Sequence, residues 1–240
     1  MHGLIIKAFI WIFKVQSYEA EKDISEYPNL REFFIRKLKR GLRPLASAEI
    51  IHPCDSRIQE HGEVIGGTTQ LKEATLLQAK GVSYSLNDFS QDSEAAKKWN
   101  QGYFVTYYLH PRDYHWAHFP MDGVVTRIKK IPGHLWPVNQ WAVSWIPNLY
   151  IQNARVFIEL STAYGPVGIC MVGAFNVGRI SIEVQEGQTV KKGDPLGYFN
   201  FGSTVIVLYP STLYNKYKNQ FSFPDPIRLG ETLVTPSSQV

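Results

Sequence analysis

The chain has 240 residues, of which 44% are hydrophobic and 19% are charged, and it carries a formal net charge of +4. This length and apolar content suffice for a sizeable core, and so modest a charge argues against a nucleic-acid-binding protein. The two cysteines, Cys54 and Cys170, form no CxxC pattern, so they predict no disulfide framework and fit a reducing, cytoplasmic compartment.

The N-terminal stretch GLIIKAFIWIFKV predicts a helix over about residues 4–16. About twelve helical residues span roughly 18 Å, well short of the roughly 30 Å hydrocarbon core of a bilayer, so this helix is not expected to cross a membrane. We expect it to lie in the membrane interface, with its lysines reaching phosphates and its aromatic rings deeper. The membrane-binding residues are then Lys7, Phe9, Trp11, Phe13 and Lys14. A core helix is the alternative, whereas the following SYEAEKD offers no signal-peptide cleavage site.

A basic segment, NLREFFIRKLKRGLRPLA, predicts a second helix over about residues 28–40, with cations gathered around Phe33 and Phe34. Each basic residue near an anionic leaflet contributes about 1 kcal/mol of binding. These residues are Arg31, Arg36, Lys37, Lys39, Arg40 and Arg43. We therefore expect residues 1–45 to form a membrane-associating helical segment before a catalytic domain over 46–240. A solvated helix face is the alternative interpretation.

The next candidate is Asp55, which lies in a Pro-Cys-Asp-Ser turn just before a short alternating strand. A carboxylate hydrogen-bonded to one ring nitrogen of a histidine fixes its tautomer and leaves the other nitrogen to take a serine proton. An aspartate that caps its own turn is the alternative.

Two histidines, His115 and His118, lie in YFVTYYLHPRDYHWAHFPMDGVVT, between two runs that predict strands. Pro111 and Pro120 bracket them and favour an irregular backbone, in which both imidazoles can share one pocket. Histidine has a pKa of roughly 6.5, which suits proton transfer near neutrality. Surface or zinc-binding histidines are the alternative, but matching Cys or His ligands are missing, so we expect no metal.

The remainder of the pattern is mainly β (α+β), with frequent Gly and Pro, and further short helices are expected over 84–90 and 93–99. The tryptophans Trp136, Trp141 and Trp145 suggest a lipid-facing loop. The stretch VGRISIEVQEGQTVKKGDPLGYF resembles the hairpins of barrel-sandwich folds, with turns at Glu186-Gly187-Gln188 and Lys192-Gly193-Asp194. The polar tail TPSSQV is expected to fray.

The most informative stretch is VKKGDPLGYFNFGSTVIVLYP, in which Gly202-Ser203 interrupts two strand-like runs. Glycine admits unusual backbone geometry, so the Ser203 hydroxyl can attack the carbonyl of Gly202 in an N-to-O acyl shift. Removal of the Ser203 α-proton then eliminates the ester, and the new chain end hydrolyses to a pyruvoyl group with loss of ammonia. An ordinary bulge in a strand is the alternative for this tripeptide alone.

Taken together, these segments resemble the phosphatidylserine decarboxylase family of pyruvoyl enzymes. The resemblance covers nearly the whole chain, and FFIRKLKRGLRP and HPRDYHWAH are its most specific parts. The matching segments are NLREFFIRKLKRGLRPLA, HPCDSRI, LLQAKGVSYSLNDF, YLHPRDYHWAHFPMDGVV, PGHLWPVN, IPNLYIQNARV, VGAFNVGRI and KKGDPLGYFNFGSTVIVLYP.

The resemblance implies that the chain cleaves itself before Ser203 into a β chain, 1–202, and an α chain, 203–240. Asp55, His118 and Ser203 would form the self-processing triad, Ser203 would become the covalent pyruvoyl cofactor, and His115 would donate or relay a proton. The amine of phosphatidylserine would form a Schiff base with the pyruvoyl ketone, which accepts electrons as CO2 leaves and phosphatidylethanolamine forms.

The resemblance further implies a peripheral protein on the cytoplasmic face of the bacterial inner membrane, with an anionic membrane surface as partner, and it allows a homodimer. Three positions depart from the usual family pattern. Phe201 stands where Leu or Val is common, Ala154 replaces a glutamate between Asn153 and Arg155, and Ser56 replaces a glycine. Because none of these removes a residue of the implied chemistry, we expect an active enzyme.

Three other functions are weighed against this one. A soluble pyruvoyl decarboxylase of a free amino acid would share the cleavage site but would not need the apolar N-terminus. A Ser-His-Asp hydrolase would normally offer a GxSxG turn, which is missing here. A barrel-sandwich carrier domain would need an exposed lysine at a hairpin tip, for which Lys191 and Lys192 are poorly placed.

Overall fold

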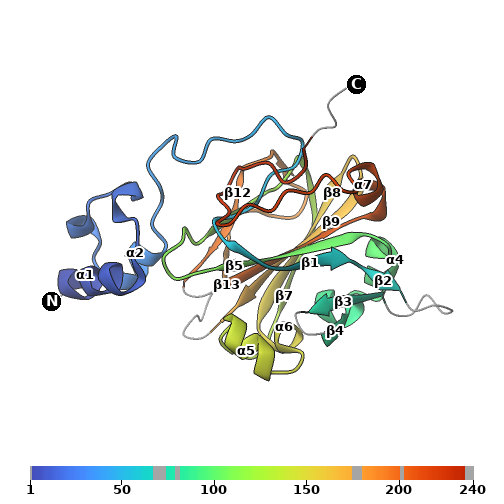
Figure 1. Cartoon of the computed structure of the whole chain (residues 1–240), viewed down its shortest axis with the longest axis horizontal. Helices are drawn as coiled ribbons and strands as arrows, with labels where there is room; N and C mark the ends of the chain where they lie inside the picture. Colours follow the sequence, from blue (N-terminus) through green and yellow to red (C-terminus); the bar gives the residue numbers. More distant parts are fainter. Residues whose placement is uncertain (1, 67–73, 79–81, 175–179, 201–202, 236–240) are drawn as a thin grey trace.

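Most of the regular structure is antiparallel β-sheet (Figure 1). The computed structural model describes residues 2–66, 74–78, 82–174, 180–200 and 203–235. The large sheet has the order β1 (Arg57–Glu63), β5 (Tyr103–Leu109), β13 (Ser203–Tyr209), β9 (Gly165–Gly173), β8 (Arg155–Thr162), β7 (Gly123–Ile131) and β11 (Thr189–Val190). A second sheet joins β10 (Ile180–Ile182), β12 (Pro195–Phe199) and β6 (Trp116–His118), and a third joins β2 (Ile65–Gly66), β3 (Ala74–Gln78) and β4 (Val82–Ser85). The prediction of a mainly β fold is confirmed.

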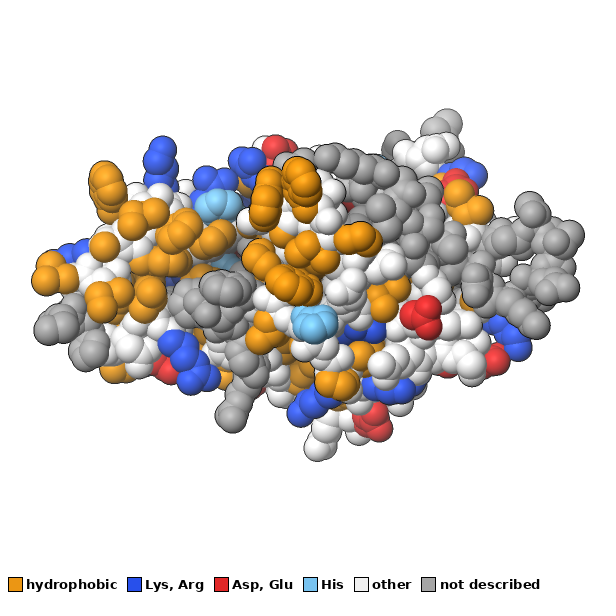
Figure 2. All heavy atoms as spheres, turned by 90° about the horizontal axis from the view of Figure 1, so that it is seen from below, with side chains coloured by type: hydrophobic (Ala, Val, Ile, Leu, Met, Phe, Trp, Pro, Cys, Tyr) orange, Lys and Arg blue, Asp and Glu red, His pale blue; other side chains and the backbone are white. Residues whose placement is uncertain are grey.

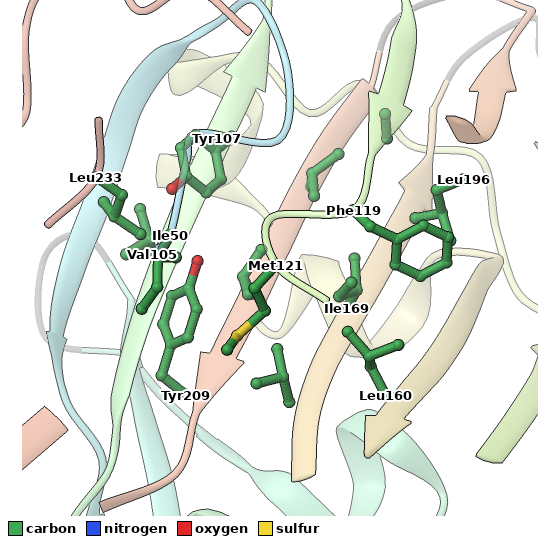
Figure 3. Packing of buried hydrophobic residues seen from close by; sticks show 14 of the residues in the cluster. Ile50, Val105, Tyr107, Phe119, Met121, Leu160, Ile169, Leu196, Tyr209 and Leu233 are labelled. Atoms are coloured by element: carbon green, nitrogen blue, oxygen red, sulfur yellow. The ribbon is translucent and has the colours of Figure 1, made fainter. Parts of the chain in front are cut away.

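The large sheet is covered on both faces, and its buried inner strand β13 contributes side chains to both. Directly opposed residues of antiparallel strands share a face, and neighbours along a strand alternate. On one face Val205 and Val207 pack in a core with Phe119 and Leu196 of the second sheet's layer (Figure 3). On the other face, residues such as Ile206 pack in a core with helices. These helices are α3 (Leu86–Ser90), α4 (Ala95–Trp99), α5 (Gln140–Trp145) and α6 (Leu149–Gln152).

The N-terminal elements form a cluster of their own, which lies to one side of the sheets in Figure 1. They are α1 (His2–Phe13), the 3-10 turns η1 (Ser17–Glu19) and η2 (Ile24–Glu26), and α2 (Leu30–Phe34). Ile6 and Phe9 of α1 pack with Phe33 and Phe34 of α2. Within the described residues, no helix combines the length and apolarity that crossing a bilayer requires. The domain division at residue 45 stays a prediction.

The orientation of α1 corrects part of the expected membrane face. Phe9 is buried and its ring lies 4.7 Å from that of Phe13, so both rings turn toward the protein. The larger residues that α1 exposes are Leu4, Ile5, Lys7, Trp11 and Ile12. Lys14 is exposed but lies just beyond the helix with a positive φ of 56°, so it does not continue the helical face of Lys7.

The helix expected over 28–40 is much shorter in the structure, where α2 ends at Phe34. Beyond α2, the chain contacts the segment that carries His115 and His118. The indole Nε1 of Trp116 donates a hydrogen bond of 2.9 Å to the Ile35 carbonyl, and Arg36 reaches the carbonyl of Arg112. These long-range contacts replace the next helical turn. The basic residues consequently divide, because Arg36 and Arg43 turn inward while Arg31, Lys37, Lys39 and Arg40 stay exposed.

The other expected elements were partly right. The short helices over 84–90 and 93–99 are confirmed as α3 and α4, whereas α5, α6 and α7 (Ser211–Lys216) were not predicted. Both glycine turns are confirmed, since Gly187 and Gly193 each have a φ of +85°, which side chains rarely adopt. The predicted fraying of the tail concerns residues 236–240, which lie outside the described part of the chain.

Candidate active site

Ser203 is the first residue of β13, at the point where the chain passes from the small sheet into the large one. β12 ends at Phe199 and β13 begins four residues later, with Ser203 opposite Leu109 on β5 and Gly173 on β9. By strand alternation Ser203 shares the face of Val205, so its side chain lies in the layer between the two sheets. The side chain is fully buried, and its Oγ has no hydrogen-bond partner among the residues that the structure describes. The expected cleavage partner, Gly202, lies outside the described residues.

His115 lies in the same layer, because its main-chain carbonyl accepts a 3.0 Å hydrogen bond from the amide of Phe199. Its Nδ1 lies 2.9 Å from the carbonyl oxygen of Asp113, which can only accept, so Nδ1 carries the hydrogen. The other ring nitrogen, Nε2, is buried without a partner. Burial, helped by the charge of Arg36, lowers the pKa of His115 to about 3, so the ring is neutral with a free lone pair.

A buried arginine supports this arrangement. Arg36 Nη2 donates to the carbonyl oxygens of Arg112 and Asp113, at 2.9 and 3.2 Å. The Asp113 oxygen therefore receives hydrogen bonds from both Arg36 and His115, which fixes the imidazole from behind. Arg36 Nε and Nη1 are buried without partners, and burial lowers the pKa of the guanidinium. The ring of Phe34 packs 3.9 Å from that of His115, centroid to centroid.

His118, on β6, has different surroundings. Its Nδ1 donates to the carbonyl of Gly193 at 2.8 Å, and its Nε2 lies 3.3 Å from the hydroxyl of Tyr114. Nε2 is thus the acceptor, and Tyr114 is the donor. Burial lowers the pKa of His118, while the charge of Asp55 opposes that shift. Asp55 therefore acts on His118 through its charge.

Asp55 is held by a set of side chains that we call the arginine cluster: Asp55, Glu19, Arg43 and Arg228. The carboxylate lies 2.6 Å from Arg43 Nη2 and 3.2 Å from Arg228 Nη1, and it accepts a 2.9 Å hydrogen bond from the amide of Leu229. Arg43 also pairs with Glu19 at 2.8 Å. Although burial opposes its charge, the hydrogen bonds to Asp55 and Glu19 raise the pKa of Arg43. Asp55 and Tyr114 both line a cavity of about 240 Å³.

The structure therefore brings the expected residues together only in part. Ser203 and His115 lie in one layer between the sheets, and His118 is on the strand beside them. Asp55 is fully buried, but its carboxylate bonds to arginines and not to a histidine. Tyr114 connects the two parts, since its hydroxyl contacts His118 and the charge of Asp55 adds to the burial that raises its pKa.

An open groove runs beside Ser203. Gly173, opposite Ser203, lines it, and a Cβ at Gly173 would meet Leu135 and Ile180 at 3.6 and 3.7 Å. It would also lie 3.3 Å from the Ala154 carbonyl oxygen, so the glycine allows these neighbours to pack closely beside the strand. The groove has a volume of about 950 Å³, and its lining includes Leu135, Ile180, Ile182 and Tyr198, with Lys130, Arg155 and Glu183 as charged members. Such a size matches pockets for substantial ligands, which typically occupy roughly 300–1,000 Å³.

Several supporting residues were not assigned to the site from the sequence. From the sequence, Arg36 and Arg43 are expected to be basic residues of the membrane-associating segment, and no role in the site is expected for Tyr114 or Arg228. Their partners are distant in the chain, as with Arg228 and Asp55, so no local spacing reveals them. The proximity of Tyr114 to His118, four residues apart in one irregular segment, was the one local signal.

The comparisons with known proteins identify the family. The model of the phosphatidylserine decarboxylase family matches residues 30–235. A phosphatidylserine decarboxylase proenzyme of Myxococcus xanthus is 37% identical over 87% of this chain and 79% of its own length. The proenzymes of Delftia acidovorans and Vibrio cholerae are each 34% identical over 95% of this chain, and over 85% and 86% of their own lengths. The chain belongs to the phosphatidylserine decarboxylase family.

Two of the three departures from the family pattern have a visible setting. Ala154 lines the groove, so a carboxylate that the family usually places there is missing from its wall. Ser56 donates through Oγ to the carbonyl of Cys54 at 3.3 Å, next to Asp55. Phe201 lies outside the described residues.

Proposed function

We propose that this chain is a self-processing decarboxylase that converts phosphatidylserine to phosphatidylethanolamine with release of CO2. The observation that carries the proposal is Ser203 itself: a fully buried serine at the start of an inner strand, whose Oγ has no partner among the described residues. Buried polar atoms are almost always hydrogen-bonded, so this hydroxyl needs an explanation. Thr204 Oγ1 also lacks a partner among the described residues, but it lies on the opposite face of the sheet, so it is the face of Ser203 that supports a reactive role. The proenzyme names of the relatives support cleavage of the chain.

The surroundings of Ser203 fit a covalent pyruvoyl group formed from that residue. His115 Nε2 and Ser203 Oγ are both buried, and neither has a partner among the described residues. Such a group supplies an electron sink for the loss of CO2 from an amino acid. The hydrophobic layer keeps water from the site, which strengthens every electrostatic interaction within it.

In self-processing, His118 is the base that takes the proton of Ser203. It is neutral, its Nδ1–H is held by the Gly193 carbonyl, and its Nε2 carries the lone pair, with Tyr114 as the present donor. Asp55 stabilises the protonated state of His118 by its charge rather than by a direct hydrogen bond, and the arginine cluster fixes the position of that charge. Tyr114 must release Nε2 for this transfer.

In decarboxylation, His115 moves one proton. Its Nε2 has a lone pair and no hydrogen, so it must accept a proton before it can donate one. The ammonium group of the substrate has to lose a proton to become nucleophilic, and His115 Nε2 takes it. The same nitrogen then returns the proton to the carbon that has lost CO2. Arg36 keeps the ring in position through the Asp113 carbonyl.

The groove beside Ser203 favours a lipid over a free amino acid. Its apolar wall of Leu135, Ile180 and Ile182 suits glycerol and the first acyl carbons, and Lys130 offers a charge for the phosphodiester. The exposed apolar residues of α1 and the basic residues near it suit a peripheral position on an anionic membrane surface, at the cytoplasmic face of the inner membrane. The homodimer stays a prediction.

Intact-mass spectrometry of the purified protein tests the proposal, with and without borohydride and phosphatidylserine. We expect two chains split before Ser203, the shorter one lighter by the elements of ammonia and trapped as an adduct with the lipid. An adduct with free serine but not with phosphatidylserine would favour the amino-acid decarboxylase. A single chain that reacts with a fluorophosphonate would favour a hydrolase, and the proposal would then be wrong.

A further inference from the structure

The helix α5 exposes two large aromatic side chains with no visible covering. Trp141 and Trp145 are 68% and 72% exposed, and their rings lie 6.2 Å apart. The opposite side of the same helix is firmly attached, because Ala142 and Val143 are buried in the helical layer and Asn139 caps the first turn through the amide of Ala142. The tryptophans are therefore presented by a fixed helix, not by the loop expected from the sequence.

Figure 1 shows α1 at the left end of the molecule and α5 at its bottom, and the view from below in Figure 2 shows hydrophobic side chains gathered in two places, at the left and near the middle. In α1 the exposed members include Leu4, Ile12 and Trp11, the last 81% exposed. The segment that leads into α5 adds Leu135 and Trp136, which are also exposed. Leu135 also belongs to the wall of the groove, so the groove borders the exposed segment that leads into α5.

The chemistry of this face matches a lipid surface. Exposed apolar patches of this kind mark interaction sites, and tryptophan is the residue enriched where a protein meets the membrane interface. Neither α1 nor α5 contains an acidic residue, so neither repels an anionic leaflet. Lys, Arg and His side chains border both hydrophobic groups in Figure 2, as expected for contact with phosphates.

We propose that α5 is a second bilayer contact, which together with α1 turns the mouth of the groove toward the lipid surface. This inference rests on the proposed function, since it assigns the partner surface from which a lipid substrate enters. One contact leaves the protein free to swivel on the membrane. Two contacts on one face fix its tilt, so that a headgroup can enter beside Ser203 while the acyl chains stay largely in the leaflet.

The test is sedimentation of the full-length protein with vesicles of phosphatidylcholine and phosphatidylglycerol. The double variant Trp141→Ser/Trp145→Ser loses two large apolar contacts, so we expect its affinity to fall on the order of ten- to a hundred-fold. The conservative variant Trp141→Phe/Trp145→Phe should keep most of the binding. Val124→Ser is the control, because Val124 is an exposed apolar residue on β7 rather than on either helix, and it should bind like the original chain.

A second readout separates this inference from the proposed function. The serine variant should decarboxylate dispersed short-chain phosphatidylserine at the unchanged rate and lose activity on vesicles. If the original chain decarboxylates neither substrate, the proposed function fails while the vesicle measurement still judges α5. Unchanged vesicle binding by the serine variant overturns the inference. So does a change from dimer to monomer in light scattering with vesicle binding intact, since α5 would then be a contact between two copies.

Discussion

The two ends of the site differ in whether their buried polar atoms have partners. In the arginine cluster, the carboxylates of Asp55 and Glu19 meet the guanidinium groups of Arg43 and Arg228, with Asp55 also holding a main-chain amide. At the end between the sheets, which we call the closed end, Ser203 Oγ, His115 Nε2 and two nitrogens of Arg36 are buried without partners. The charged groups of the arginine cluster are paired, whereas these atoms of the closed end have no partner among the described residues. The difference shows that the arginine cluster holds positions, whereas the closed end keeps reactive atoms free.

The largest expected effect separates Ser203 from its neighbour. Ser203→Ala removes the hydroxyl at the closed end, so the chain should stay in one piece and show no decarboxylation. Thr204→Val is the matched control, because Thr204 is equally buried and its Oγ1 also lacks a partner, but it lies on the opposite face of the sheet. Intact mass distinguishes them: we expect two fragments for the valine variant. Cleavage of the alanine variant would remove Ser203 from the chemistry.

The two histidines give the next effect. His118→Ala should leave a single chain, because the base for Ser203 is lost. His115→Ala should still cleave, but its decarboxylation rate should fall by about 10²–10⁴-fold, the usual contribution of a positioned acid or base. Gel electrophoresis measures the first step and release of CO2 measures the second. Normal maturation of the His118 variant would take the base role from that residue.

Substitutions in the arginine cluster should lower the free energy of unfolding. Asp55→Asn leaves Arg43 and Arg228 with an uncompensated positive charge, and breaking a buried pair in this way costs about 3–5 kcal/mol. Chemical denaturation measures the loss. The double variant Asp55→Asn/Arg43→Gln should lose less than the sum of the two single changes, since the partners disappear together. Additive losses would mean that the pair contributes little.

Buried histidines predict the response to acid. Burial lowers the pKa of His115 to about 3 and that of His52 to about 4, against roughly 6.5 in an unfolded chain. Below 6.5 the unfolded chain binds protons that the folded chain refuses, so their stabilisation is complete above that pH and is lost as the pH falls toward 4 and 3. Thermal melting should therefore fall steeply below pH 6.5, and less so in His52→Asn.

Asp113 has the opposite sign and supplies the control for that curve. Burial raises the pKa of its carboxyl to about 6, so its stabilisation is present at acid pH and is lost as the pH rises through about 6. Asp113→Asn should raise the relative stability at neutral pH and leave the acid limb in place. A flat profile for the original chain between pH 7 and 4 would contradict this assignment.

The smallest effect concerns the groove. A methyl group at Gly173 would lie 3.3 Å from the Ala154 carbonyl, so Gly173→Ala should be tolerated with a small shift of the neighbours. Gly173→Leu would fill the space toward Leu135 and Ile180, and we expect it to raise KM for long-chain phosphatidylserine several-fold. Steady-state kinetics on mixed micelles checks this. An unchanged KM would place the acyl chains elsewhere.

The features predicted correctly are those that depend on residues close together in the sequence. The β-rich fold follows from short alternating runs, the turn at Gly193 from its need for a positive φ, and α1 from an unbroken helical stretch. The pair His115 and His118 was also visible, because two prolines enclose it. Which face α1 buries was not predictable from its composition, since Phe9 and Trp11 are both large and apolar and only the packing against Phe34 separates them.

The missed features depend on contacts between distant parts of the chain. The helix expected over 28–40 ends early because Trp116, 81 positions from Ile35, takes its carbonyl. The setting of Asp55 depends on Arg228, 173 positions away. A local pattern of basic residues does not show whether each of them faces a membrane or pairs with an aspartate. Arg36 and Arg43 were therefore expected on the surface, although both turn inward.

The position of Ser203 at the head of an inner strand has a consequence for the lifetime of the protein. Under the proposed function, cleavage before Ser203 would leave residues 203–240 as a separate chain, with β13 still bonded to β5 on one side and β9 on the other. The processed protein would then be a complex of two fragments that arose from one folding event. Once unfolded, the short fragment diffuses away, and reassembly becomes bimolecular and dependent on concentration. Under this proposal, the unfolded processed protein does not refold as a single chain. Molecules that lose their fold are then replaced by new synthesis rather than by refolding.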